Sequence, residues 1–281
     1  MSRQFIAIAT TISLLSLPAY GADVFGSGAG SGDGDFLRDS YSDDWDMSDN
    51  GDPLDFEYGL RYFYSIGSSK LTVNGANYSS EDQSHIVELH ARIDDNSTET
   101  FLKGRIGYAA AISGTYIRDG VAGEPDINVG SLGYIAADFG YTPVGTDEVR
   151  VGAYVGYEYL ADNVDKTRSS HINATEDDLF VHALKLGAVA RAEINDIIDI
   201  NLEAAAIPFA YLDGVLAGNL YGASGGLMFG VNVSDDLTIR VGGRAMYLTG
   251  SSATVPGSAA TSVTDIELMR YGALLEITGR F

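Results

Sequence analysis

The sequence predicts an all-β protein, a transmembrane antiparallel β-barrel of about ten strands in an up-and-down meander. Apolar and polar residues alternate with a period of two from residue 54 to the end of the chain. One side of the strands carries Arg, Lys and acidic residues, whereas the other side is almost purely aliphatic and aromatic. Long and short connections alternate between the strands, which is typical of barrels with long outer loops and short inner turns.

The composition excludes several classes of protein. The 281 residues have a formal net charge of −22, 45% hydrophobic residues and no Cys. This apolar content excludes a disordered chain, and the lack of Cys excludes disulfides, Cys metal sites and thiol catalysis. The negative charge argues against nucleic acid as a partner, because its phosphates would be repelled.

The first 53 residues differ from the rest of the chain. Residues 1–21 have the pattern of a signal peptide, with Arg3, the apolar stretch Phe5–Pro18, and Ala19 and Gly21 at the positions that precede cleavage. Residues 22–53 are rich in Gly and Asp, and we expect a flexible acidic tail because they bury too little apolar area to order themselves. Residues 54–281 form the predicted barrel.

Five strands are expected at residues 54–66, 84–94, 100–113, 128–141 and 147–160, each with one apolar face and one charged face. In the first strand, Tyr58 and Leu60 alternate with Glu57 and Arg61. On the charged faces of the next four strands lie, in order, Glu88 and Arg92, Lys103 and Arg105, Asp138, and Arg150 and Glu158.

Five more strands are expected at residues 178–193, 197–211, 221–233, 237–249 and 265–281. The third of these is rich in Gly and uncharged. On the charged faces of the other four strands lie, in order, Lys185 and Arg191, Asp199 and Glu203, Arg240 and Arg244, and Arg270, Glu276 and Arg280.

The alternation predicts where these eighteen charges lie. In hydrocarbon every backbone polar group needs an internal partner, so a membrane-spanning sheet must close and present its apolar parity to lipid. The charges then point inward, where they are stable only if paired. We expect a salt-bridged lumen that is slightly positive. A soluble sandwich or lipocalin-like barrel also alternates, but normally leaves some charges on its outside.

The last eleven residues, YGALLEITGRF (Tyr271–Phe281), combine an amphipathic strand with a C-terminal aromatic residue. They resemble the final strand of bacterial outer-membrane β-barrel proteins. The resemblance implies that Tyr271 and Phe281 belong to the signal that the barrel-assembly machinery reads. It also implies an outer-membrane location in a Gram-negative cell, with both termini periplasmic. The implied partners are periplasmic chaperones, outer-membrane lipid and lipopolysaccharide.

The number of strands is similar to that of the omptins, which are outer-membrane proteases. That resemblance implies an Asp pair on one outer loop facing an Asp–His pair on another. Here the fourth outer loop has Asp213 but no His, and Asp119 and Asp126 of the second loop are seven residues apart. His171 in the third loop belongs to no Asp-x-His motif. The omptin pattern is therefore absent.

Other short motifs also lack the context that their chemistry needs. The G-x-S-x-G match at Gly222–Gly226 starts a strand, whereas a nucleophile elbow joins a strand to a helix. His182 has no Ser nearby on the predicted lipid face, and the Asp-rich tail does not fit a calcium loop. We therefore expect no catalytic, cofactor-binding or metal-binding residues.

Three functions remain open on the sequence alone. The first is an outer-membrane barrel of structural or surface-interaction type, in which the outer loops contact ligands or surfaces. The second is a narrow channel for ions or small solutes, with lumen Arg residues setting its selectivity. The third is an omptin-like or lipid-acting enzyme. The absence of a catalytic pattern favours the first.

Overall fold

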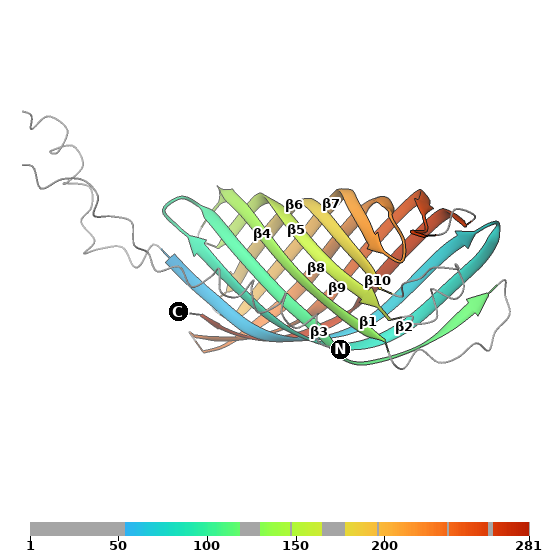
Figure 1. Cartoon of the computed structure of the whole chain (residues 1–281). Coiled ribbons are helices and arrows are strands. Elements are labelled where there is room, and N and C mark those ends of the chain that lie inside the picture. Colours follow the sequence, from blue (N-terminus) through green and yellow to red (C-terminus); the bar gives the residue numbers. More distant parts are fainter. Residues whose placement is uncertain are drawn as a thin grey trace, which may run out of the picture. The chain divides into compact units, whose positions relative to one another are not determined.

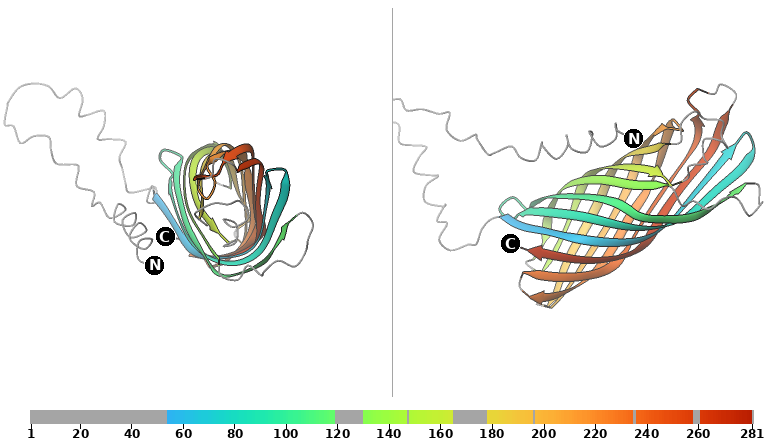
Figure 2. Two further views of the ribbon diagram at one scale, coloured as in Figure 1. Left: turned by 45° about the vertical axis from the view of Figure 1, so that its right-hand side comes forward. Right: turned by 60° about the horizontal axis from the view of Figure 1, so that its bottom comes forward.

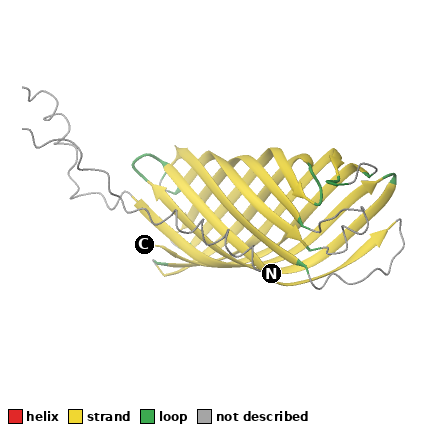
Figure 3. Cartoon of the chain, viewed as in Figure 1, coloured by secondary structure: helices red, strands yellow, loops and turns green. Residues whose placement is uncertain are grey.

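The computed structural model describes residues 54–118, 130–146, 148–164, 178–195, 197–234, 236–257 and 261–280. Almost all of them lie in strands, and no helix among them is long and apolar enough to cross a membrane (Figure 3). The strands are β1 (Leu54–Val73), β2 (Ala76–Asp95), β3 (Thr100–Arg118), β4 (Ser131–Gly145), β5 (Val149–Asn163), β6 (Leu179–Asn195), β7 (Ile198–Gly214), β8 (Gly218–Ser234), β9 (Leu237–Thr254) and β10 (Ser262–Arg280). The predicted signal peptide, acidic tail, His171 and Phe281 lie outside the described residues.

The ten strands form one closed antiparallel barrel in which each strand pairs with its neighbours in sequence (Figures 1 and 2). The barrel closes between β1 and β10, whose ladder runs from Glu57 opposite Arg280 to Val73 opposite Val263. The start of β1 and the end of β10 therefore lie at the same end. The predicted fold class, strand number and meander order are confirmed.

The barrel has two levels, which we name by their connections. The lower level carries the short turns between β2 and β3, β4 and β5, β6 and β7, and β8 and β9; the upper level carries the other connections. At the lower level the turns have the predicted short lengths. At the upper level most strands run further than predicted, whereas β4 and β6 begin slightly later, at Ser131 and Leu179. The expected loop at residues 67–83 is instead a continuation of β1 and β2.

The β1–β2 connection is a two-residue turn of Asn74 and Gly75, whose φ angles are 49° and 85°. Positive φ at both positions is typical of the type I′ turn that joins tight hairpins, and Asn-Gly is its preferred sequence. The prediction of a long loop was wrong because the apolar residues of these strands move from the outward face to the inward face near the upper level. The alternation that indicated a strand therefore became harder to recognise.

This change of sides is visible within β1. At the lower level its exposed residues are apolar, including Leu60 and Tyr62, and its inward residues include Glu57 and Arg61. At the upper level the apolar residues are inward and buried, whereas the outward residues are polar. Inward Leu71 and Val73 alternate there with outward Ser68, Lys70 and Thr72.

The described pairing of β3 differs along its length. β3 pairs with β4 from Thr100–Tyr141 to Tyr108–Gly133, but β3 continues to Arg118, and over that stretch its pairing among the described residues is with β2. The described β3–β4 ladder ends at Tyr108, which is exposed and is among the last apolar outward residues of β3, so this ladder ends where the apolar outer band ends.

Candidate functional site

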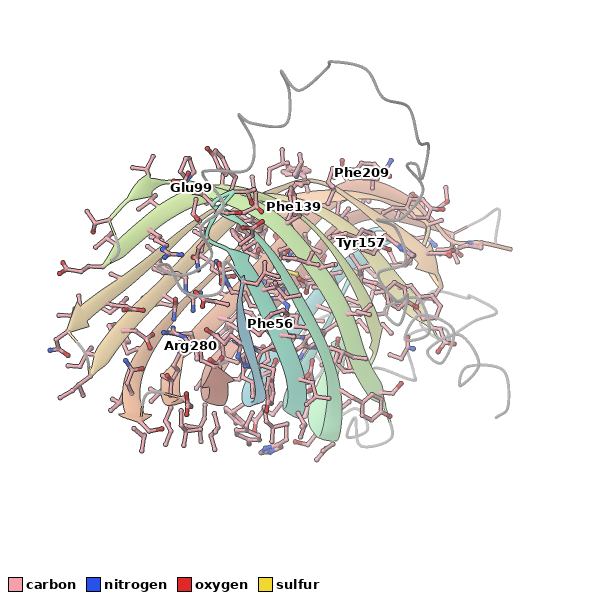
Figure 4. The ribbon with its side chains drawn as sticks, turned by 90° about the vertical axis from the view of Figure 1, so that its left-hand side faces the viewer. Phe56, Glu99, Phe139, Tyr157, Phe209 and Arg280 are labelled. Carbon is pink, nitrogen blue, oxygen red and sulfur yellow. The ribbon has the colours of Figure 1, made fainter. Side chains whose placement is uncertain are left out.

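The charged side chains of the lower level form the candidate site. They enter the lumen because successive residues of a strand point to opposite faces of the sheet. Figure 4 shows the outer wall, where the labelled Phe139, Tyr157 and Phe209 are exposed, and nitrogen atoms of inward side chains gather between the strands. The interior charges come from nine of the ten strands, since β8 supplies none.

The lowest layer of ion pairs spans the full width of the lumen. Glu57 of β1 accepts hydrogen bonds from Arg191 of β6 at 2.7 Å and from Arg240 of β9 at 3.0 Å. β1 and β6 are five strands apart in either direction around the barrel, so the Arg191–Glu57 pair joins opposite walls. Arg240 also donates to Glu276 at 2.9 Å and to Asp199 at 3.0 Å.

The middle layer centres on Glu88, whose side chain has no exposed surface. It accepts hydrogen bonds from Arg61, from Arg244 at 2.9 Å and from the hydroxyl of Tyr134. Arg61 also donates to Glu276, which links this layer to the one below. Three strands beside or across from β2 thus hold one buried carboxylate, and each of its oxygens has a donor.

A second group of pairs fills the lumen at a similar height. Lys103 of β3 contacts Glu203 of β7 at 2.5 Å and Asp138 of β4 at 3.5 Å. Lys185 of β6 contacts Asp138 at 2.8 Å and Glu158 at 3.4 Å. β3 and β7 are four positions apart around the barrel, so the Lys103–Glu203 pair also runs across the lumen rather than along the wall.

The uppermost ion pairs lie where the interior changes from charged to apolar. Arg270 of β10 donates to both oxygens of Asp82 at 3.0 and 2.9 Å, and to the hydroxyl of Ser65 at 3.0 Å. It also lies 3.9 Å from Asp162 of β5, on the opposite wall. Arg270 is therefore the third cation, after Arg191 and Lys103, that joins facing walls.

Two of the eighteen predicted charges lie at the lower rim instead of within these layers. Arg150 donates to Asn96 in the β2–β3 turn at 2.6 Å. Arg280 lies 3.6 Å from Glu193, and both side chains are exposed to a large extent.

Three interior carboxylates lie outside the eighteen predicted charges, although the sequence places Asp94 on the same face of its strand as Glu88 and Arg92. Asp82 and Asp162 bind Arg270, and Asp94 accepts two hydrogen bonds of 2.7 Å from Arg92. Each has the inward parity of its strand, but Asp82 and Asp162 lie beyond the strand ends that the sequence predicted. They raise the interior anions from seven to ten, against nine cations once Arg150 and Arg280 are counted at the rim, so the interior is close to neutral and not positive.

The upper level of the interior is apolar, which the sequence analysis did not predict. Its buried side chains belong to one hydrophobic cluster that includes Leu71, Val73, Leu132, Leu179, Val181, Leu212, Leu216, Leu248, Val263 and Ile266. Such a core is typical of a water-exposed β-barrel, whose apolar parity faces inward. The ionic interior is therefore confined to the lower level.

A small cavity of about 50 Å³ lies between the ion pairs and the apolar core. Arg105 lines it and donates to Glu158 at 2.5 Å, while the Nε atom of Arg105 has no hydrogen-bond partner among the described residues. A water molecule needs about 10–15 Å³ of such volume, so the cavity has room for a few waters. The other lining residues include Phe63, Tyr134, Tyr154, Glu203, Ser224 and Arg244.

The described His residues do not meet carboxylates at the upper end of the lumen. His90 is buried at the lower level, 3.6 Å from Glu276. His85 and His182 lie on the outer wall beside Tyr residues. Ser224 lies inside β8 and not at a turn into a helix. Within the described part of the chain, no group of three or more His, Asp or Glu side chains is placed to hold a metal ion.

Comparison with known proteins identifies the fold. No protein-family model matches the sequence, and no curated protein sequence matches it. The structure is similar to that of the outer membrane protease OmpT from Escherichia coli, with a TM-score of 0.54 and 6% identity over 82% of this chain and 97% of that one. At such low identity the likeness concerns the fold alone.

Two further solved structures match less well. The outer membrane protein OprG from Pseudomonas aeruginosa has a TM-score of 0.36 and 10% identity over 81% of this chain and 95% of that one. The toluene transporter TodX from Pseudomonas putida has a TM-score of 0.31 and 9% identity over 83% of this chain and 90% of that one. The chain has the closed ten-stranded fold of bacterial outer-membrane β-barrel proteins.

Proposed function

We propose that this protein is an integral outer-membrane β-barrel of structural or surface-interaction type, with a closed lumen and an upper level that projects from the membrane. The observation that carries the proposal is the set of ion pairs joining opposite walls. Arg191–Glu57, Lys103–Glu203 and Arg270–Asp162 cross the interior at successive heights. The apolar core then fills the interior above them.

The lipid-facing role of the lower level follows from its exposed side chains. Large apolar residues on every strand are about half exposed there, including Leu89, Phe139, Val155, Leu186 and Leu275. Each square ångström of apolar surface left in water costs about 25 cal/mol, so a continuous apolar band is stable only against hydrocarbon. A tilted strand needs about 9–11 residues to cross the bilayer, and these strands have 15 to 20.

The additional residues form the upper level, which supports its exposure to water. There the polar residues face outward and the apolar residues face inward, the reverse of the lower level. We place this level outside the cell, because barrels of this kind have short turns on the periplasmic side and longer elements outside. Both termini of the barrel are then periplasmic, where chaperones and the barrel-assembly machinery meet Tyr271 and Phe281.

The interaction surface in this proposal is the outward face of the upper level together with the outer connections. Its described residues are hydroxyl, amide and charged side chains, such as Ser79, Glu81 and Gln83 of β2. Polar loops held on a rigid barrel are a common place for binding, because the scaffold limits the entropy that the loops lose when a partner binds.

Planar-bilayer recording tests the closed lumen. The purified, refolded protein should show no steady conductance, while an open porin in the same bilayer provides the positive control. Simultaneous replacement of Glu57, Asp199 and Glu276 by Ser should remove the lowest layer and raise the frequency of transient openings. Steady wild-type conductance that is lost in Arg61→Ser or Arg150→Ser would instead establish the channel.

Turnover assays test the enzyme alternative independently. Peptide and phospholipid substrates are incubated with the refolded barrel in the presence of lipopolysaccharide, and flat progress curves are expected. Turnover that persists through purification and is lost on replacement of a described side chain would overturn the structural assignment.

A further inference from the structure

Two clusters of Tyr and His on the outer wall have the same construction. The first consists of Tyr62 and Tyr64 of β1 with His85 of β2, and the second of Tyr157 and Tyr159 of β5 with His182 of β6. In both, the His lies directly opposite the second Tyr in the strand register, as His85 is opposite Tyr64. His182 is likewise opposite Tyr159. We call them the outer-wall Tyr–His clusters.

Their contacts also agree. The hydroxyl of Tyr62 lies 2.5 Å from Nδ1 of His85, and that of Tyr157 lies 2.7 Å from Nδ1 of His182. The ring of the second Tyr packs against the His ring with centroids 5.3 Å apart in the first cluster and 5.1 Å apart in the second. The interplanar angles are 58° and 56°. The same arrangement therefore recurs four strands away.

Each cluster retains a hydrogen-bond donor that no described residue uses. If the Tyr hydroxyl donates to Nδ1, a neutral imidazole carries its proton on Nε2. If Nδ1 donates instead, the hydrogen of the hydroxyl is unused. In either tautomer, one hydrogen lies between the Tyr hydroxyl and Nδ1, and a second N–H or O–H remains available to donate to another molecule. Since Tyr62, His85 and Tyr157 are exposed, a molecule at the barrel surface can reach this donor.

The clusters lie at the border between the two levels. Below His85, β2 presents the exposed apolar residues Val87 and Leu89; above it, the outward residues are Gln83 and Glu81. Below His182, β6 presents exposed Leu184 and Leu186. The border between an apolar and a polar outer wall is the depth of the lipid headgroups, where aromatic residues with polar groups are enriched.

We propose that each outer-wall Tyr–His cluster binds a phosphate group of the phosphorylated glycolipid in the outer leaflet. The inference rests on the proposed membrane location and names the lipid site within it. Phosphate oxygens are strong acceptors, and a hydrogen bond to a charged acceptor is about twice as strong as a neutral one. Neutral Tyr and His donors suit this depth because, unlike Lys or Arg, they leave no isolated charge beside hydrocarbon when no lipid is bound.

Further aromatic rings lie beside and above the second cluster. Tyr211 of β7 is opposite His182 and packs 6.4 Å from it, and Phe180 stacks on Tyr159 at 5.9 Å. These rings provide apolar area for the sugar face, while the exposed Leu184 and Leu186 below His182 provide it for the first methylene groups of the acyl chains. A phosphate at the cluster and acyl chains along the wall below it would then hold the barrel at a fixed depth.

Native mass spectrometry of the refolded barrel with bis-phosphorylated lipid A tests the proposal. The wild type should retain two lipid A molecules at micromolar lipid. His85→Phe and His182→Phe should each retain one, and the double variant should bind at least tenfold more weakly at both sites. Tyr247→Phe removes an exposed outer-wall hydroxyl on β9, at least two strands away from either cluster, and should retain two.

The lipid probe separates phosphate recognition from other binding. Dephosphorylated lipid A should not be retained, and equal retention would overturn the proposal. Equal retention of phosphatidylglycerol would reject the glycolipid as the specific occupant. Undiminished lipid A binding by the double variant would overturn the site itself. Folding of each variant is checked by the mobility shift on heating in SDS gels, and a wild-type chain that is soluble without detergent would refute the membrane location separately.

Discussion

The interior carboxylates show how single residues stabilise this barrel. Glu88 is fully buried between Arg61, Arg244 and Tyr134, and it therefore neutralises more than one guanidinium. A buried ion pair is not by itself a large source of stability, because both ions lose their hydration. Removing one partner is costly, however, since it leaves a charge that is buried without compensation.

We predict that Glu88→Gln destabilises the barrel by about 3–5 kcal/mol, the cost of breaking a buried ion pair by removing one partner. The measurement is urea unfolding in lipid vesicles, followed by circular dichroism. Glu267→Gln is the matched control, because Glu267 pairs with Lys70 at 3.4 Å on the exposed surface and such pairs contribute about 0–1 kcal/mol. Equal effects of the two substitutions would contradict the role assigned to the middle layer.

Gly107 keeps Tyr134 in position to donate to Glu88. A Cβ atom at residue 107 would lie 2.4 Å from the Tyr134 ring. Gly107→Val should therefore displace the ring and destabilise the barrel by about 1–3 kcal/mol, as over-packing of a filled interior does. Gly104, three residues earlier on β3, has nothing within 4 Å of its Cβ position, so Gly104→Ala serves as the control. Unchanged urea midpoints for both variants would show that Tyr134 is not held by this contact.

At the scale of the strands, the described pairing of β3 has a measurable consequence. Up to Tyr108, β3 pairs with both β2 and β4; from Ala109 to Arg118 the described pairing is with β2 alone. Amide hydrogens of that upper stretch that point away from β2 have no described ladder partner, so we predict that they exchange with solvent faster than those of residues 101–108.

Hydrogen exchange followed by mass spectrometry checks this prediction in vesicles. The control is the upper part of β2, because residues 78–85 lie at the same level but pair with both β1 and β3. Protection of residues 109–118 equal to that of residues 78–85 would mean that the β3 edge is covered in the membrane.

The lower strands could be predicted from sequence because apolar and charged residues alternate strictly along them. The inward parity of Arg61 and Glu88 follows from the apolar residues beside them. The upper extensions were not predicted, because the alternation reverses at the border. Leu71 and Val73 there lie on the same face of the strand as the charged residues of the lower level. The Asn74–Gly75 pair was the signal that could have identified a hairpin there.

The partners within the site were beyond the sequence analysis for a different reason. Parity determines that Glu57 and Arg191 both point inward, but their pairing depends on the register of all the strands between them. That register brings opposite walls within hydrogen-bond distance only after the barrel has closed. Asp82 and Asp162 were missed for the related reason that the ends of β2 and β5 could not be located.

At the scale of the whole molecule, the two levels have opposite construction, which the proposed membrane location explains by two different solvents. The lower level has an apolar exterior and a paired ionic interior, as expected for a protein in hydrocarbon. The upper level has a polar exterior and an aliphatic core, as expected in water. In the proposed location, the border between the levels sets the depth of insertion and the part of the molecule that partners can reach.

Quenching of tryptophan fluorescence by brominated acyl chains tests this construction most directly. Trp45, the natural tryptophan, is replaced by Phe, and a single Trp is introduced at Leu275, which is 50% exposed at the lower level, or at Phe63, which is 2% exposed inside the barrel. A third variant carries it at Lys70, which faces outward at the upper level. The account predicts strong quenching for Leu275→Trp and little for Phe63→Trp or Lys70→Trp. Stronger quenching at residue 63 or residue 70 than at residue 275 would contradict it.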